Sequence, residues 1–277
     1  MKKKALARLL SGATLLPIGL LALSSAALAD NVSVEGSVNW SGKTTSSLSI
    51  SLDGGTEFNS VRAGEPELTV TDVSGDVADL PTGLSGVTDL SQLEFSEYVW
   101  CIDPVQYAAS NVSYTWDLVA LEEAPDPGPV MGVENAADMR LLFGNVYTDI
   151  LGGTAPITGV DRGVLFDAFQ LAIWEISKET SDIYSLSGGV FQADAPDAAK
   201  AQADLWLSAL NALNDGTASA FDADAIANNL FALTGNNGDG SVQDYIVAVV
   251  PLPAAVWLFG SALLGMVGVG YRRRKQS

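Results

Sequence analysis

Residues 112–120 have the sequence VSYTWDLVA, in which apolar and polar side chains alternate. Alternation with a period of two places every second side chain on one face of a β-strand. Here one face carries Tyr114, Trp116 and Leu118, which are large and mostly apolar. We therefore predict a strong strand over these residues, and a second strong strand over residues 95–102.

The chain before these strands also has β periodicity. Residues 32–40 and 48–52 place apolar side chains at alternate positions, with Ser, Thr and Gly between them, and residues 68–70 favour a further strand. Glycine and proline residues between these segments mark turns. Residues 72–94 show no strong pattern, which indicates a long loop.

The period becomes helical after a proline-rich segment at residues 125–129. We predict four helices and a closing strand, namely residues 135–150 after an Asn135 capping box, 161–177, a helix from an Asp194 cap to Gly216, 223–233, and a strand at 244–250. The predicted fold class is α+β, with N-terminal antiparallel β-strands followed by a helical half and a C-terminal transmembrane helix. The first 60 residues are a candidate separate β layer within this domain.

The composition excludes several classes of site. The chain has 277 residues, no histidine, 14 Lys and Arg and 33 Asp and Glu, which gives a formal charge of −19 at pH 7. Without histidine, a Ser-His-Asp triad, a Cys-His dyad and a His-ligated zinc or haem cannot be built. An acidic surface repels phosphates, so nucleic acid is not expected as a partner. We predict no metal centre and no cofactor, and we do not expect an enzyme.

Basic residues gather at the two ends of the chain. Residues 30–250 hold all 33 acids but only six of the 14 bases, which leaves this segment with a formal charge of −27. Residues 1–29 begin with lysines, continue through an apolar run and end on Ala27, Leu28 and Ala29. This order predicts a signal peptide that is removed after Ala29, with a retained membrane anchor as the alternative.

A second apolar segment covers residues 254–270, where Ser261 is the only polar side chain. As a helix of 17 residues it would be roughly 25 Å long, which with its flanks is enough to cross a bilayer core. Arg272, Arg273 and Arg274 follow it and favour the cytoplasmic side. We therefore predict a transmembrane helix that holds residues 30–250 across the inner membrane.

A proline motif precedes this segment and consists of Val250, Pro251, Leu252, Pro253 and Ala254. Together with the apolar span and the arginine cluster, residues 251–277 resemble the PEP-CTERM sorting signal in its VPLPA variant. Leu252 stands where the commoner form has Glu. The resemblance implies processing by an exosortase, a membrane transpeptidase, in a Gram-negative bacterium that makes exopolysaccharide or biofilm matrix. A permanent single-span anchor is the alternative.

Cys101 is the only cysteine of the chain, so it cannot form an internal disulfide. A small buried hydrophobe is its simplest interpretation. Gln170 lies in the predicted helix 161–177 with apolar residues on both helix faces, so we expect the helix to be buried nearly all round. Burying an unpaired amide costs on the order of 1 to 3 kcal/mol, so Gln170 needs a partner. A backbone carbonyl, another polar side chain or Cys101 would serve, while Gln106 is nearer to Cys101 in sequence but is expected to face solvent.

Residues 98–103 have the sequence YVWCID, and residues 169–174 have the sequence FQLAIW. They resemble the YCID-like strand motif and the TQxAIW helix motif of the thioester domains of bacterial surface adhesins, with a thioester-like core from about residue 95 to residue 250. Phe169 stands where that family has Thr. The resemblance implies an internal thioester between Cys101 and Gln170, which an amine-bearing surface or matrix molecule would attack. It also implies a water-excluding pocket around the bond, to which we assign Trp100, Phe166, Ile173 and Trp174.

Three functions follow from these patterns. The first is an exported, exosortase-processed surface or extracellular-matrix protein that serves adhesion or biofilm cohesion through a thioester. The second is a purely structural matrix protein in which Cys101 and Gln170 are only core residues. The third is a secreted hydrolase that uses a pair of carboxylates, although no spacing among the 33 acids indicates one pair.

Overall fold

The computed structural model describes the part of the chain between its two basic ends. The described residues are 31–40, 44–64, 66–152, 161–180, 183–235 and 242–251. The predicted signal peptide and the predicted transmembrane segment lie outside them. The same holds for six residues of the predicted sorting signal, Leu252, Pro253, Ala254, Arg272, Arg273 and Arg274.

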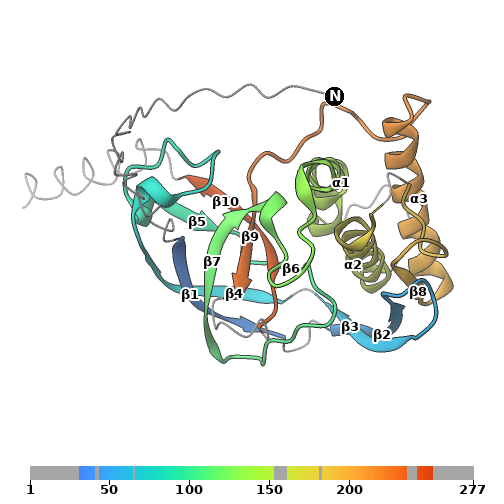
Figure 1. Ribbon diagram of the computed structural model, residues 1–277, viewed down its shortest axis with the longest axis horizontal. Coiled ribbons are helices and arrows are strands. Elements are labelled where there is room, and N and C mark those ends of the chain that lie inside the picture. The colour runs from blue at the N-terminus through green and yellow to red at the C-terminus, as the bar shows by residue number, and fades with distance from the viewer. Residues whose placement is uncertain are drawn as a thin grey trace, which may run out of the picture.

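An antiparallel sheet of seven strands forms the centre of the molecule (Figure 1). Its spatial order is β4, β1, β7, β9, β10 and β5, and β6 also pairs with β10. The strands are β1 (Val32–Asn39), β4 (Glu67–Ser74), β5 (Leu93–Phe95), β6 (Trp100–Cys101), β7 (Ser113–Ala120), β9 (Leu230–Gly235) and β10 (Tyr245–Pro251). Strands from both ends of the described chain therefore lie in one sheet.

The two outer parts of this sheet meet, so that the sheet is nearly closed into a barrel. The segment between β5 and β6 approaches β4, where the Leu68 N–H donates to the Glu97 carbonyl at 2.7 Å and the Val99 N–H donates to the Pro66 carbonyl at 3.2 Å. These bonds pair backbone groups that an open sheet would leave at its edges.

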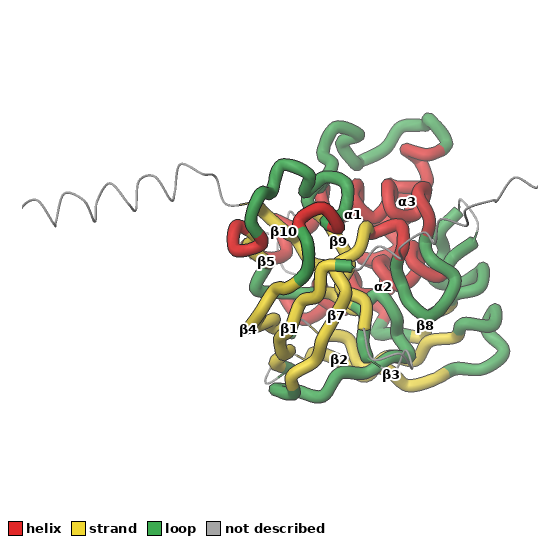
Figure 2. The backbone as a smooth tube through the Cα atoms, turned by 60° about the vertical axis from the view of Figure 1, so that its left-hand side comes forward, coloured by secondary structure: helices red, strands yellow, loops and turns green. Residues whose placement is uncertain are grey.

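Three helices and a small second sheet pack against the barrel. The helices are α1 (Gly132–Gly152), α2 (Arg162–Lys178) and α3 (Asp197–Asn214), and the second sheet has the order β3 (Asn59–Gly64), β2 (Thr44–Ser51) and β8 (Gln192–Asp194). Figures 1 and 2 show the helices on one side of the barrel, with the small sheet near α2 and α3. Three short 3-10 helices lie in the connections, namely η1 (Val77–Asp79), η2 (Leu90–Gln92) and η3 (Leu121–Glu123).

Helix α2 lies at the centre of the fold. It begins after Asp161, whose side chain accepts a hydrogen bond from the Gly163 N–H at 2.7 Å and so caps the first turn. Every residue from 165 to 177 is buried, because α2 contacts β2, β3 and β6 as well as α1 and α3. The expectation of a helix buried nearly all round is confirmed.

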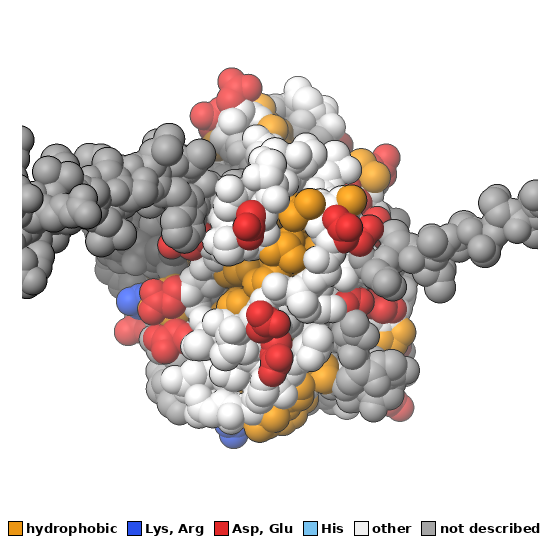
Figure 3. Space-filling view, turned by 90° about the vertical axis from the view of Figure 1, so that its left-hand side faces the viewer, with side chains coloured by type: hydrophobic (Ala, Val, Ile, Leu, Met, Phe, Trp, Pro, Cys, Tyr) orange, Lys and Arg blue, Asp and Glu red, His pale blue; other side chains and the backbone are white. Residues whose placement is uncertain are grey.

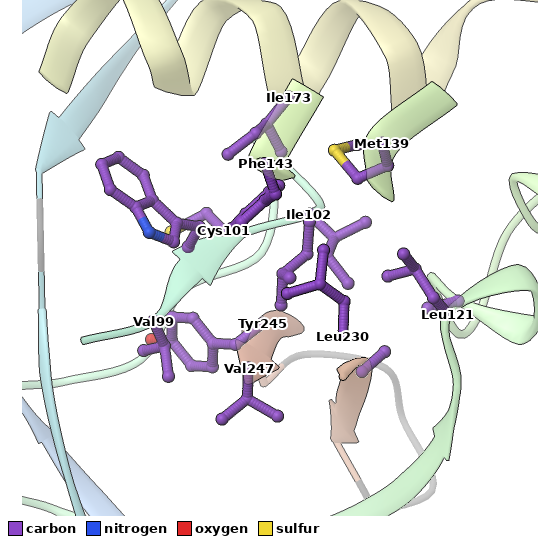
Figure 4. Packing of buried hydrophobic residues seen from close by; sticks show 14 of the residues in the cluster. Val99, Cys101, Ile102, Leu121, Met139, Phe143, Ile173, Leu230, Tyr245 and Val247 are labelled. Atoms are coloured by element: carbon purple, nitrogen blue, oxygen red, sulfur yellow. The ribbon is translucent and has the colours of Figure 1, made fainter. Parts of the chain in front are cut away.

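The core lies between the helices and the strands of the barrel. Figure 4 shows Phe143 of α1 and Ile173 of α2 on one side of Cys101, with Tyr245 and Val247 of β10 on the other side. All five of these side chains are buried. β6 is therefore enclosed between a helix layer and a strand layer, which removes its side chains from water.

The predicted fold class is wrong in its arrangement. The strands are not confined to an N-terminal half, because β8, β9 and β10 follow α2 or α3 in the chain, and β9 and β10 lie in the middle of the barrel. Of the first 60 residues, the candidate separate β layer, residues 32–39 form a strand of the barrel and residues 44–51 belong to the small second sheet. The sheet is assembled from pairings between distant segments, and local periodicity does not specify which strands pair.

The predicted transmembrane helix is part of the same correction. In the described ranges, the three helices are too short or too polar for any of them to span a bilayer. The apolar segment at residues 254–270 lies outside those ranges.

Three local predictions also need correction. The predicted helix at 223–233 is not formed, because its last residues begin the strand β9. Asn135 lies within α1 instead of capping it, and Asp194 ends β8 three residues before α3 begins. Asn135 Nδ2 instead donates to the Ile176 and Glu179 carbonyls, and Asp194 pairs with Ser49 of β2.

Candidate functional site

Cys101 lies on β6, opposite Tyr245 of β10. The next residue along, Ile102, donates its N–H to the Asp244 carbonyl at 3.0 Å. Because hydrogen-bonded and non-hydrogen-bonded pairs alternate along an antiparallel ladder, the N–H and C=O of Cys101 point away from β10. These two buried backbone groups therefore need a partner on the other side of β6.

The side chain of Gln170 is that partner. The Cys101 N–H donates to Gln170 Oε1 at 3.2 Å, and Gln170 Nε2 donates to the Cys101 carbonyl at 2.8 Å. The carboxamide thus takes the place of a neighbouring strand, at a position where Gln170 is completely buried. Since the amide carbon is bonded to both Oε1 and Nε2, it is held directly beside the residue that carries the thiol.

Two further side chains of α2 fix the segment after Cys101. Ser177 Oγ donates to the Ile102 carbonyl at 3.1 Å. Lys178 Nζ forms an ion pair with Asp103 Oδ2 at 2.7 Å, and the two side chains are only 10% and 7% exposed. No sequence pattern predicted the roles of Ser177 and Lys178, because both depend on residues that lie 75 positions earlier.

The Cys101 thiol is buried and free of any disulfide. Burial raises the pKa of this thiol far above its usual range, and the negative charge of Asp103 raises it further. At neutral pH the sulfur therefore carries its proton. Because the thiolate is the nucleophilic form, the buried thiol is not activated for nucleophilic attack in this structure.

Trp100 and Phe166, two of the four predicted pocket residues, belong to an aromatic cluster. The Trp100 ring lies 5.7 Å from the Phe166 ring and 4.7 Å from the Phe169 ring, measured between centroids. Successive side chains of a strand point to opposite faces, so Trp100 and Cys101 face opposite ways. Phe169, which stands where the thioester family has Thr, is a fully buried member of this cluster.

Ile173 and Trp174, the other two predicted pocket residues, are also buried. Trp174 lines a cavity of about 450 Å³ together with Cys101. The described residues around this cavity are Trp40, Ser47, Ser60, Val61, Arg62, Cys101, Pro104, Gln106, Tyr107, Ala108, Ser110, Trp174 and Gln243. The predicted pocket residues therefore divide between the cavity and the aromatic cluster on the other face of β6.

The cavity brings together residues from distant parts of the chain. Trp40 follows β1, Arg62 lies on β3, and Gln243 precedes β10. None of them was a predicted site residue, although the alternation in residues 32–40 placed Trp40 on the apolar face of its strand. Neither Asp nor Glu occurs among the described lining residues, so the cavity wall offers no carboxylate pair for glycoside hydrolysis.

Gln106, the nearer sequence partner of Cys101, is engaged elsewhere. Its Nε2 donates to the Asp126 carbonyl at 3.1 Å, and its Oε1 accepts from the Asp244 N–H at 2.8 Å. Gln170 is therefore the glutamine whose carboxamide contacts the Cys101 backbone.

The start of the predicted sorting signal belongs to the barrel. Val250 pairs with Glu94 and Pro251 pairs with Leu93, at the end of β10. The remaining residues of the motif lie outside the described part of the chain. No family model matches the chain, and neither a curated protein nor a solved structure matches it.

Proposed function

We propose that this chain is an exported surface or extracellular-matrix protein in which Cys101 and Gln170 form an internal thioester for covalent adhesion. The observation that carries the proposal is the double hydrogen bond between the Gln170 carboxamide and the Cys101 backbone. It holds an amide carbon beside the residue that carries the thiol, and both side chains are buried. A partner amine would then attack the thioester, which gives a stable amide bond and frees the thiol.

The bond-forming step balances without a cofactor. The sulfur of Cys101 attacks the side-chain carbonyl carbon of Gln170, the C–N bond breaks, and the amide nitrogen leaves as ammonia with the thiol proton. Gln170 Oε1 already accepts the Cys101 N–H, which is a donor placed to stabilise negative charge on that oxygen during the attack. The buried thiol must lose its proton during this step, so we expect bond formation to be slow and to occur once, during folding.

Export and sorting are part of the same proposal. β1 begins at Val32, close after the predicted signal-peptide cleavage, and β10 ends at Pro251, inside the predicted sorting motif. The barrel thus uses both ends of the predicted ectodomain. An exosortase cut on the C-terminal side of Pro251 would leave β10 intact and release or re-anchor a complete domain.

A purely structural matrix protein is the second candidate, and one observation favours it. The two hydrogen bonds fully account for the burial of Gln170, because they cap the edge of β6 at Cys101. In this case the glutamine stabilises the fold and no covalent chemistry takes place.

The intact mass of the native chain distinguishes these candidates. Thioester formation removes one ammonia, so the native chain is expected to be about 17 Da lighter than its sequence mass after cleavage of any leader. Cys101→Ala and Gln170→Ala should each restore the full mass, whereas Gln106→Ala should keep the deficit. Hydroxylamine should release one titratable thiol from the native protein. A native chain of full mass, with a thiol that is free after unfolding, would refute the thioester and leave the structural role.

A further inference from the structure

The cavity beside Cys101 differs in charge from the rest of the ectodomain. Residues 30–250 carry 33 acids and six bases, and acidic side chains are the main charged groups on the face shown in Figure 3. The described residues that line the cavity include no acid and one base, Arg62. Arg62 is exposed and forms no ion pair with another described residue. The cavity is therefore a locally positive site in an acidic protein, which favours an anionic ligand.

Two hydrogen-bond donors in the cavity wall have no partner. The indole Nε1 atoms of Trp40 and Trp174 are both buried, and neither donates to an acceptor of the protein. Buried donors are normally paired, since leaving one unpaired costs about 1–3 kcal/mol. Because protein atoms enclose both nitrogens, a ligand in the cavity would reach them only after a shift of the wall.

The remaining lining side chains define the shape of the ligand. Tyr107 is 71% exposed, so its aromatic ring is accessible to a ligand, and Trp40 is partly exposed, whereas Trp174 is almost completely buried. Ser47, Ser60 and Ser110 add hydroxyl groups. Aromatic surface combined with hydroxyl and amide groups suits a pyranose ring, which has apolar C–H faces and polar hydroxyls at its edge. The volume of about 450 Å³ lies in the range of small-molecule sites.

We propose that this cavity binds an acidic saccharide, with the sugar carboxylate on Arg62 and the apolar face of the sugar ring against Tyr107. A guanidinium donates two parallel hydrogen bonds to a carboxylate, which gives specificity for the acidic sugar over the neutral one. The proposal goes beyond the thioester and does not depend on it, because non-covalent binding requires no bond between Cys101 and Gln170.

Titration of the full-length chain with digalacturonate and with its neutral counterpart, followed by tryptophan fluorescence and calorimetry, tests this proposal. We expect digalacturonate to bind at least about tenfold more tightly than the neutral disaccharide. Arg62→Gln should abolish this preference, and Arg62→Lys should restore part of it. Tyr107→Ala removes the exposed aromatic ring from the cavity wall, and it should weaken the binding of both sugars.

Matched controls separate this proposal from the thioester. Arg162→Gln changes a base outside the cavity and should leave binding unchanged, and the intact mass of the native chain reports on the thioester independently of sugar binding. Equal binding of the two sugars, or an Arg62→Gln variant with unchanged preference, would overturn the proposal. Absence of binding by both sugars at millimolar concentration would also overturn it. So would a short peptide that binds through its terminal carboxylate as tightly as the sugar acid.

Discussion

Glu175 provides the sharpest test of the energetics of this fold. It lies on α2 between Trp174 and Ile176, is completely buried, and accepts the Ser185 N–H at 2.5 Å on Oε1. Its Oε2 has no partner. Burial and, to a smaller extent, the negative charges of Glu179 and Asp204 raise the pKa of this carboxyl to about 8 against the opposing effect of the Ser185 hydrogen bond.

The consequence for stability has a definite sign. In the unfolded chain the pKa of Glu175 returns to its ordinary value of 4.5. Between that value and about pH 8 the folded state holds a proton that the unfolded state has released, so the free energy of unfolding falls as pH rises. At about 1.4 kcal/mol for each pKa unit, the loss reaches about 5 kcal/mol above pH 8.

The substitution Glu175→Gln removes this loss. Glutamine has nearly the same shape, keeps an oxygen for the Ser185 N–H and cannot ionise. Urea unfolding is expected to give similar stability for both proteins at pH 4.5, and to show the variant more stable by about 2–5 kcal/mol at pH 8.5.

A surface carboxylate supplies the matched control for this experiment. Glu94 is exposed on β5, and Glu94→Gln should show no comparable change between the two pH values. If Glu175→Gln changed stability by the same amount at pH 4.5 and pH 8.5, the assignment of a buried neutral carboxyl would be wrong.

Three other substitutions test separate contacts by chemical denaturation. Gln170→Ala leaves the buried N–H and C=O of Cys101 unpaired and should cost about 2–5 kcal/mol; a cost below about 1 kcal/mol would contradict the strand-capping role. Lys178→Met leaves the charge of Asp103 buried and should lower the free energy of unfolding by about 3–5 kcal/mol. Adding Asp103→Asn should restore much of this stability in the double variant. If the effects of the two substitutions on stability simply added, the ion pair would be excluded. Gly144→Ala should destabilise α1 by about 1–3 kcal/mol, because the added Cβ would overlap a backbone carbonyl of the facing loop; helix propensity alone predicts the opposite sign.

Local periodicity predicted the elements that are buried on one side only. β1 and β7 have one face toward the core, so their alternation was visible, and α2 was recognised from its cap and its apolar composition. β9 was mistaken for the end of a helix. It lies between β7 and β10 with five consecutive residues buried, from Leu230 to Thr234, and a strand buried on both faces shows no alternation.

Prediction from local periodicity failed for a different reason at residues 95–102, where we expected one continuous strand. Its apolar side chains do lie in strands, but β5 and β6 are separated where the backbone turns from β10 toward β4 to close the barrel. The closing contact involves Pro66 and Leu68, about 30 residues earlier, so no window around residues 95–102 contains it.

Sequence motifs predicted only one part of the candidate site, the pair Cys101 and Gln170. Cys101 and Gln170 lie 69 residues apart, and the structure brings them into direct contact. The cavity could not be predicted in the same way. Trp40, Arg62 and Gln243 come from three segments whose proximity depends on how the barrel and the small sheet pack together.

The position of β10 has a consequence for the timing of folding. The last described strand to be synthesised lies in the interior of the sheet, between β9 on one side and β5 and β6 on the other. In a nascent chain that ends before Tyr245, β5 and β6 would therefore lack the strand that they pair with, even if all other strands had formed. Closure of the barrel therefore follows the synthesis of β10, because β9, β5 and β6 all pair with this strand.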